Sequence, residues 1–240
     1  MLSLILLAEL IALYFLSRWV TIGLFELFLL LFRQRPVAVT LILILEFPGT
    51  VAHELSHLFT AEVLGVHTGK LSLEPESIRG TSIISGSVAI SETDPFRRYA
   101  IGLAPVFSGM IILTAIAYFL PQVLPNWNDL GNSGYWAIPT NYLFIVVGYL
   151  LFAVSNTMFS SPQDLKGFLP FCIVVCIFVA ALYFAGIRID LTGFVLKEIT
   201  KIATTLVNSL GVVLLINAGL LLLTWALKGM MTKLFHLRIA

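Results

Sequence analysis

Charged residues are scarce in this sequence. Only 11% of the 240 residues are Asp, Glu, Lys or Arg, whereas 59% are hydrophobic. Ordinary soluble domains carry about 25% charged residues and about 45–50% apolar ones. The composition therefore excludes an ordinary soluble domain and indicates a multi-pass integral membrane protein whose surroundings are the lipid bilayer. A net charge of +1 provides no basic surface of the kind that binds nucleic acid, so we expect no nucleic-acid partner.

Cysteines and signal-peptide features are also few. Cys172 and Cys176 lie four residues apart in an apolar run and are too small a set to bind zinc alone. We interpret them as small hydrophobic packing residues. The first 16 residues have no basic stretch, and no cleavage site of small residues precedes Arg18. We therefore expect a retained membrane segment at the N-terminus and not a removed signal peptide.

Two of the four histidines fall in one short motif, His53-Glu54-Leu55-Ser56-His57, which reads H-E-x-x-H. Residues four apart on a helix share a face, with Cβ atoms about 5–6 Å apart. Both imidazoles can then bind one Zn²⁺ at about 2.0–2.1 Å. Glu54 lies beside that face, where it can take a proton from an activated water. The alternative is a chance match on an ordinary helix.

Six apolar segments have about the 20 residues that a membrane-spanning helix needs. They are residues 2–32, 37–64, 96–120, 138–159, 168–186 and 206–227. The first is either one tilted helix or a span over 2–17 followed by an interfacial helix. We therefore predict an all-α polytopic membrane protein with about six transmembrane helices in a single domain, residues 1–240.

The segment 66–94, which follows the second predicted span, has a different pattern. Glycines and charged residues interrupt it, residues 70–74 alternate with period two, and residues 85–90 do so more loosely. This pattern is typical of short strands and predicts a small β-hairpin or sheet next to the metal helix. The edge of such a sheet can hold an unwound substrate by strand addition.

Six spans would bring the C-terminal ends of the second and fourth helices to the same side of the membrane. His53 and His57 would then meet residues near the end of the fourth span, among them Asn156 and Asp164. The loops on that side, together with both termini, carry eight basic residues against five on the other side. This excess predicts that the metal site faces the cytoplasm.

A catalytic zinc has three protein ligands and one open position, so two histidines are not enough. Charged residues near membrane segments are costly and are therefore functional candidates. Asp164 lies at the end of a span on the correct side and is our predicted third metal ligand. Glu76, in the strand-like segment, is the competing candidate. The alternative role of Asp164 is an N-cap for the fifth helix.

At this point the chain resembles the site-2 protease family of intramembrane zinc metalloproteases. Members have H-E-x-x-H in one membrane helix and an Asn-…-Asp-Gly motif two helices later, to which Asn156 and Asp164 correspond at the same spacing. The glycine after the aspartate stands later here, at Gly167, and the family's Gly-Pro pair appears as Gly102-Leu-Ala-Pro105. The resemblance covers roughly residues 37–167, with residues 1–36 and 168–240 as accessory helices.

The resemblance implies a zinc metalloendopeptidase that cuts membrane proteins within or near a transmembrane segment, in a bacterial or archaeal cytoplasmic membrane. Zn²⁺ would be held by His53, His57 and Asp164, and Glu54 would be the catalytic base. Asn156 would hold the substrate backbone or the oxyanion, or alternatively make a hydrogen bond between helices. Two other classes stay open: a non-proteolytic scaffold or chaperone of the same fold, and a transporter.

Overall fold

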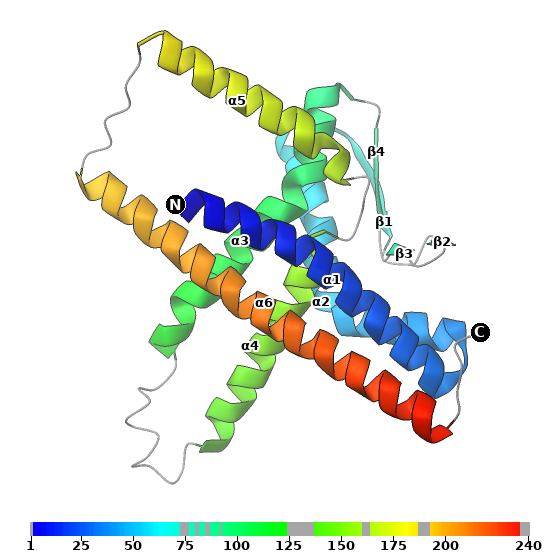
Figure 1. The fold of residues 1–240 in the computed structure, drawn as a ribbon. Helices are drawn as coiled ribbons and strands as arrows, with labels where there is room; N and C mark the ends of the chain where they lie inside the picture. The colour runs from blue at the N-terminus through cyan, green and yellow to red at the C-terminus, as the bar shows by residue number, and fades with distance from the viewer. Residues whose placement is uncertain are drawn as a thin grey trace.

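The computed structural model describes residues 2–72, 77–79, 82–84, 87–91, 93–123, 137–159, 164–186 and 193–235. These residues form a helical protein with a small β-element (Figure 1). Its helices are α1 (Leu2–Phe32), α2 (Arg35–Val63), α3 (Pro95–Val123), α4 (Ala137–Thr157), the 3₁₀ turn η1 (Asp164–Gly167), α5 (Phe168–Phe184) and α6 (Gly193–Phe235). The segment between α3 and α4, residues 124–136, lies outside the described residues.

Four described segments are long and apolar enough to cross a membrane, namely Leu2–Phe32, Arg35–Val63, Pro95–Ile116 and Val195–Lys233. The prediction of six spans is therefore wrong in number. The described apolar parts of the fourth and fifth predicted spans, Ile145–Thr157 and Phe168–Phe184, are shorter than the four. A 17-residue helix such as α5 extends only about 25 Å, less than the hydrocarbon thickness of about 30 Å.

At the two ends of the chain, the structure decides one open alternative and corrects one prediction. Leu2–Phe32 is one continuous helix of 31 residues, which settles the choice between one helix and two. The last helix begins at Gly193 and has 43 residues, whereas the sequence predicted a span over 206–227. The polar residues before 206, including Lys197, Glu198 and Lys201, belong to this helix because Lys and Glu are good helix formers despite their low hydropathy.

The C-terminal end of α4 lies at the centre of the bundle. The last two turns of this helix, from Leu151 to Thr157, and the following Met158 are buried throughout. One hydrophobic cluster joins them to α1, α3 and α6, with Leu13, Leu113 and Leu210 among its fully buried members. A second cluster joins them to α1 and α2. The end of α4 is therefore fixed by contacts with helices on several sides.

Helices α1 and α6 run in the same direction along each other, as Figure 1 shows. Glu9 lies next to Gly211, Gly23 next to Thr224, and Glu26 pairs with Lys228 at 2.6 Å, so the partners keep a nearly constant offset along both helices. Six alternating spans would make the first and last helices antiparallel. The parallel packing puts the beginning of α6 at the same end as the beginning of α1, which corrects the expected placement of both termini on one side.

Gly49 allows α2 to approach α4 closely. A Cβ atom at this position would overlap the backbone carbonyl of Ala153 and the hydroxyl of Thr157. Five residues earlier on α2 and four residues earlier on α4, Tyr149 Oη lies 3.5 Å from the carbonyl oxygen of Ile44. The two helices are thus parallel, as the sequence predicted for the second and fourth spans, and their C-terminal ends lie on the same side.

The predicted β-element follows α2 directly. Gly65, with a φ of 67°, adopts the left-handed conformation that ends many helices. Strand β1 (Thr68–Ser72) then pairs antiparallel with β4 (Ser87–Ile90), with Leu71 opposite Val88. A second, separate pair is formed by β2 (Ser77–Arg79) and β3 (Ser82–Ile84). Both β1 and β4 contact α2, so the prediction of a small sheet beside the metal helix is confirmed.

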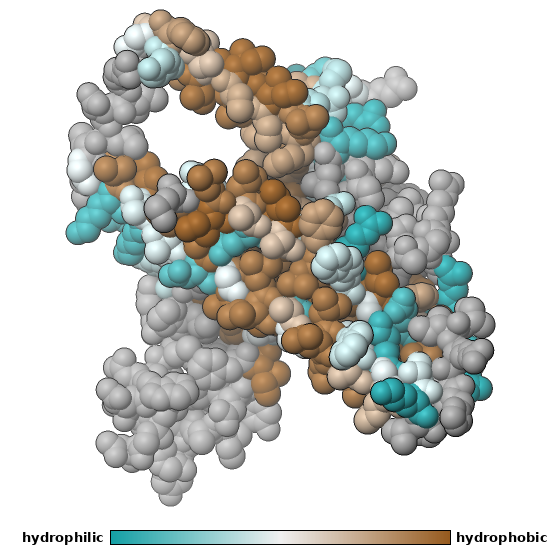
Figure 2. All heavy atoms as spheres, in the orientation of Figure 1, coloured by the Kyte–Doolittle hydropathy of each residue, from teal (hydrophilic) through white to brown (hydrophobic). Residues whose placement is uncertain are grey.

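The hydrophobic surface is extensive (Figure 2). Large apolar side chains such as Leu4, Ile44, Phe59 and Trp225 are more than half exposed. Helix α5 carries no buried residue and extends away from the other helices (Figure 1). A surface of this kind is stable only in an apolar environment, which agrees with a helical membrane protein.

Candidate metal centre

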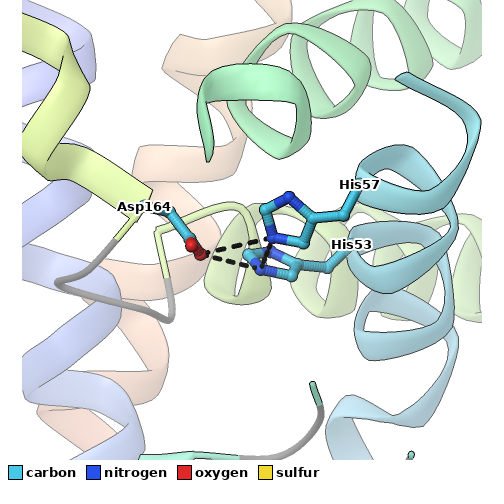
Figure 3. Close-up of side chains that lie close together, drawn as sticks. All are labelled: His53, His57 and Asp164. Carbon is cyan, nitrogen blue, oxygen red and sulfur yellow. Dashed lines mark hydrogen bonds and ion pairs between the residues drawn. The ribbon is translucent and has the colours of Figure 1, made fainter. Parts of the chain in front are cut away.

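Three predicted site residues meet at one point of the structure (Figure 3). His53 and His57 lie on one face of α2, and Asp164 is the first residue of η1. His53 Nε2 is 3.2 Å from Asp164 Oδ2, His57 Nε2 is 3.4 Å from the same oxygen, and the two Nε2 atoms are 3.2 Å apart. Both histidines are buried, with 5% and 7% of their surface exposed. The three side chains could together hold a metal ion.

The geometry of these three atoms can be tested against a tetrahedral zinc site. Zinc binds histidine nitrogen and carboxylate oxygen at about 2.0–2.2 Å, so two ligand atoms of a tetrahedron are about 3.3–3.6 Å apart. The observed separations of 3.2, 3.2 and 3.4 Å are close to this value. The donor set of two imidazoles and one carboxylate is also that of a catalytic zinc site. The residues therefore fit a zinc ion.

His57 is held in the orientation that a metal ligand requires. Its Nδ1 atom lies 2.8 Å from the backbone carbonyl oxygen of Ile101 in α3. Because a carbonyl oxygen only accepts hydrogen bonds, the proton must be on Nδ1. Nε2 therefore points at Asp164 and His53, and its lone pair becomes available to a metal ion when Nε2 gives up its proton, as metal binding requires. Such a hydrogen bond behind the ligand is typical of metal-binding histidines.

Asp164 is positioned by close packing of η1 against α3. Gly102 faces the backbone of Asp164, where an added Cβ would lie 3.0 Å from its carbonyl oxygen. Gly167, at the other end of η1, faces Tyr99, which an added Cβ would approach to 2.7 Å. The two glycines let the turn approach the helix closely enough for the carboxylate to reach the histidines.

Asp164 is in its ionised form. Burial alone would raise the pKa of its carboxyl group, but the facing imidazoles of His53 and His57 stabilise the charged form more strongly and hold the pKa at about 2. A carboxylate must be deprotonated to bind a metal. No side-chain cap is seen at the start of α5, whose N-cap residue is Gly167, so the structure gives Asp164 a place in the metal group and not the N-cap.

Glu54, the predicted catalytic base, lies between the two histidines in the sequence of α2 and is buried, with 5% of its surface exposed. Asn156, on α4, is equally buried. Its Nδ2 atom donates to the carbonyl oxygen of Phe152 and to Oδ1 of Asn217 on α6, both at 2.8 Å. This is the hydrogen bond between helices that the sequence left open as an alternative. Glu76, the competing third ligand, lies outside the described residues.

Two residues at this end of the bundle were not identified from the sequence. Ile101 acts through a backbone carbonyl, which any residue has, so no side-chain signal could have indicated it. Asn217 is fully buried in α6, and its Nδ2 atom donates to the carbonyl oxygen of Val213 and to Ser155 Oγ. A lone asparagine in an apolar run was a signal for it, because buried polar groups in membrane helices require a partner.

Comparison with family models, curated proteins and solved structures found no match to this chain. An interpretation of its function therefore depends on the residues of the metal centre and on their arrangement in the fold.

Proposed function

We propose that this protein is an intramembrane zinc metalloprotease that hydrolyses peptide bonds of membrane proteins. The observation that carries the proposal is the convergence of His53, His57 and Asp164 at separations that suit a tetrahedral zinc, with a buried glutamate between the histidines. A structural zinc site needs no glutamate at that position, whereas a hydrolytic one needs a base close to the metal.

Each residue of the site has a defined role in the proposed reaction. His53, His57 and Asp164 bind the metal, and zinc in such a site supplies the Lewis acidity that activates water and polarises a peptide carbonyl. Glu54 accepts a proton from the attacking water. It then passes that proton to the nitrogen of the leaving amine, so that the two halves of the peptide separate. The Ile101 carbonyl keeps His57 in its ligating tautomer throughout.

The substrate in this proposal is a membrane protein that presents an extended segment to the site. A peptide bond within a helix is shielded by its neighbours, so the substrate must unwind before cleavage. The pair β1–β4 contacts the helix that carries the motif. Each strand of a two-stranded sheet has a second edge that can bind an extended peptide. We place this reaction in a bacterial or archaeal cytoplasmic membrane, with the site facing the cytoplasm.

The proposal is tested with Glu54→Gln, which removes the base and keeps a side chain of the same size. Purified wild type and variant would be compared for zinc content and for cleavage of a set of reporters that each carry one transmembrane helix. We expect unchanged zinc content and a loss of cleavage of about 100-fold or more, the contribution typical of general acid–base catalysis. Glu62→Gln, an exposed position on the same helix, is the matched control.

The outcomes separate the alternatives. A protein that holds zinc but cleaves no reporter as wild type would be a scaffold of this fold. Equal cleavage by wild type and Glu54→Gln would remove Glu54 from the mechanism. Cleavage that survives full removal of zinc by a chelator would contradict a metalloprotease altogether.

A further inference from the structure

Pro105 interrupts the hydrogen bonding of α3 beside the metal centre. It is the eleventh residue of a helix that runs from Pro95 to Val123, and it is fully buried. In an α-helix the backbone N–H of residue 105 would donate to the carbonyl oxygen of residue 101. Proline has no N–H, so the carbonyl oxygen of Ile101 has no donor at that position of its own helix.

His57 takes the place of the missing donor. Its Nδ1 atom lies 2.8 Å from the Ile101 oxygen, in a hydrogen bond whose two partners are both buried. The partner ring nitrogen, Nε2, faces Asp164 and His53 (Figure 3). The carbonyl that proline releases in α3 is therefore the group that holds Nδ1 of His57 and turns Nε2 toward Asp164 and His53.

A second proline in the bundle shows the same arrangement. Pro48 lies inside α2 and removes the donor that would pair with the carbonyl oxygen of Ile44. The hydroxyl of Tyr149, from α4, approaches this oxygen at 3.5 Å. In both helices a side chain from a neighbouring helix approaches the released carbonyl, as is expected where no water is present to do so. Only at Pro105 is that side chain a residue of the metal centre.

We propose that Pro105 is a positioning residue of the metal centre: by releasing the Ile101 carbonyl it fixes the imidazole of His57 with Nε2 free to bind a cation. The turn of α3 from Ile101 to Pro105 thus contacts two of the proposed metal ligands: Ile101 contacts His57, and Gly102 packs against Asp164. The inference depends on the metal centre and not on proteolysis, so it is tested without a substrate.

The experiment compares wild type with Pro105→Ala, which restores an N–H that competes with His57 for the Ile101 oxygen. Zinc affinity would be measured by competition with a chelator in detergent. We expect a dissociation constant roughly tenfold higher in Pro105→Ala, since changes behind a metal-binding histidine commonly cost 10–100-fold. Pro95→Ala, at the start of the same helix, should bind zinc as wild type does. Pro48→Ala should also leave the affinity unchanged.

A second readout reports the hydrogen bond to Ile101 directly. In zinc-loaded protein with ¹⁵N-labelled histidine, the proton on His57 Nδ1 should exchange slowly with solvent in wild type and faster in Pro105→Ala. Pro105→Gly replaces Pro105→Ala if the alanine variant does not fold. Unchanged zinc affinity together with unchanged exchange of the His57 Nδ1 proton in a folded variant would overturn the proposal. A loss of cleavage without either change would concern the proposed protease function instead.

Discussion

The carboxamides of Asn156 and Asn217 are joined by a hydrogen bond of 2.8 Å from Nδ2 of the first to Oδ1 of the second. The orientation of both groups is fixed, because each Nδ2 atom also donates to a backbone carbonyl oxygen of its own helix, which can only accept. Both hydrogens of the Asn156 amide are therefore engaged. To donate to a substrate, as predicted from the sequence, Asn156 would have to give up one of these bonds.

Replacing Asn217 by leucine should destabilise the protein. The two side chains are similar in size, but leucine leaves Asn156 Nδ2 and Ser155 Oγ without this partner in a buried place. A buried polar group that loses its partner costs about 1–3 kcal/mol. Thermal unfolding in detergent should show a lower midpoint for Asn217→Leu, while Asn208→Leu, an exposed position on the same helix, should unfold like wild type.

The coupling between the two asparagines can be measured with the double variant. If they act through the bond seen here, Asn156→Leu combined with Asn217→Leu should lose less stability than the sum of the single variants. Additive losses would show that each residue contributes by a separate route.

Gly49→Ala should separate α2 from α4. The added methyl group would overlap the Ala153 backbone, which cannot rotate away as a side chain can. Overpacking of this kind commonly costs about 1–3 kcal/mol, and the shift of α2 should also lower zinc content because His53 lies one turn further along the helix. Gly148→Ala is the control, since nothing lies within 4 Å of its added Cβ. That variant should be neutral or slightly stabilised.

The metal centre could be predicted from the sequence because its signals are local or follow from simple alternation. The motif His53-Glu54-Leu55-Ser56-His57 sets the face of one helix by its spacing alone. Asp164 followed from the rule that two spans separated by one oppositely directed span end on the same side of the membrane, and α2 and α4 do so. The start of α2 was also close, since it was expected at residue 37 and is observed at Arg35.

The direction of α6 could not be predicted in this way. Hydropathy measures whether a segment is apolar and not whether it crosses the bilayer, so α5 was counted as a span although it has only 17 residues. An odd number of miscounted spans reverses the direction expected for α6, and α6 is observed parallel to α1. The extent of α6 was missed for a related reason, since helix propensity continues through polar residues such as Lys197 and Lys201.

Asp164→Ala should lose zinc. Its Oδ2 atom is the only carboxylate oxygen in the described metal group, and two histidines without it make a weak site. Metal analysis after equilibrium dialysis should find little zinc in Asp164→Ala. Asp94→Ala, at an exposed position where the side chain pairs with Arg97, should retain about one zinc per chain. Full zinc content in Asp164→Ala would shift the third-ligand assignment to Glu76, to be examined by Glu76→Ala.

The parallel arrangement of α1 and α6 predicts which positions share a side of the membrane. Helices α1 and α2 form an antiparallel hairpin, in which Thr21 Oγ1 donates to Glu46 Oε1 at 2.7 Å. The start of α1 and the sheet after α2 therefore lie at the same end, and the end of α6 lies at the opposite one. Single cysteines at Ser3, Ser91 and Lys233 would be introduced into protein that lacks Cys172 and Cys176. In oriented membranes, an impermeant thiol reagent should label the first two from one side and the third only from the other. The six-span arrangement would instead expose all three on the same side, so labelling of Lys233→Cys together with Ser3→Cys would contradict the parallel packing of α1 and α6.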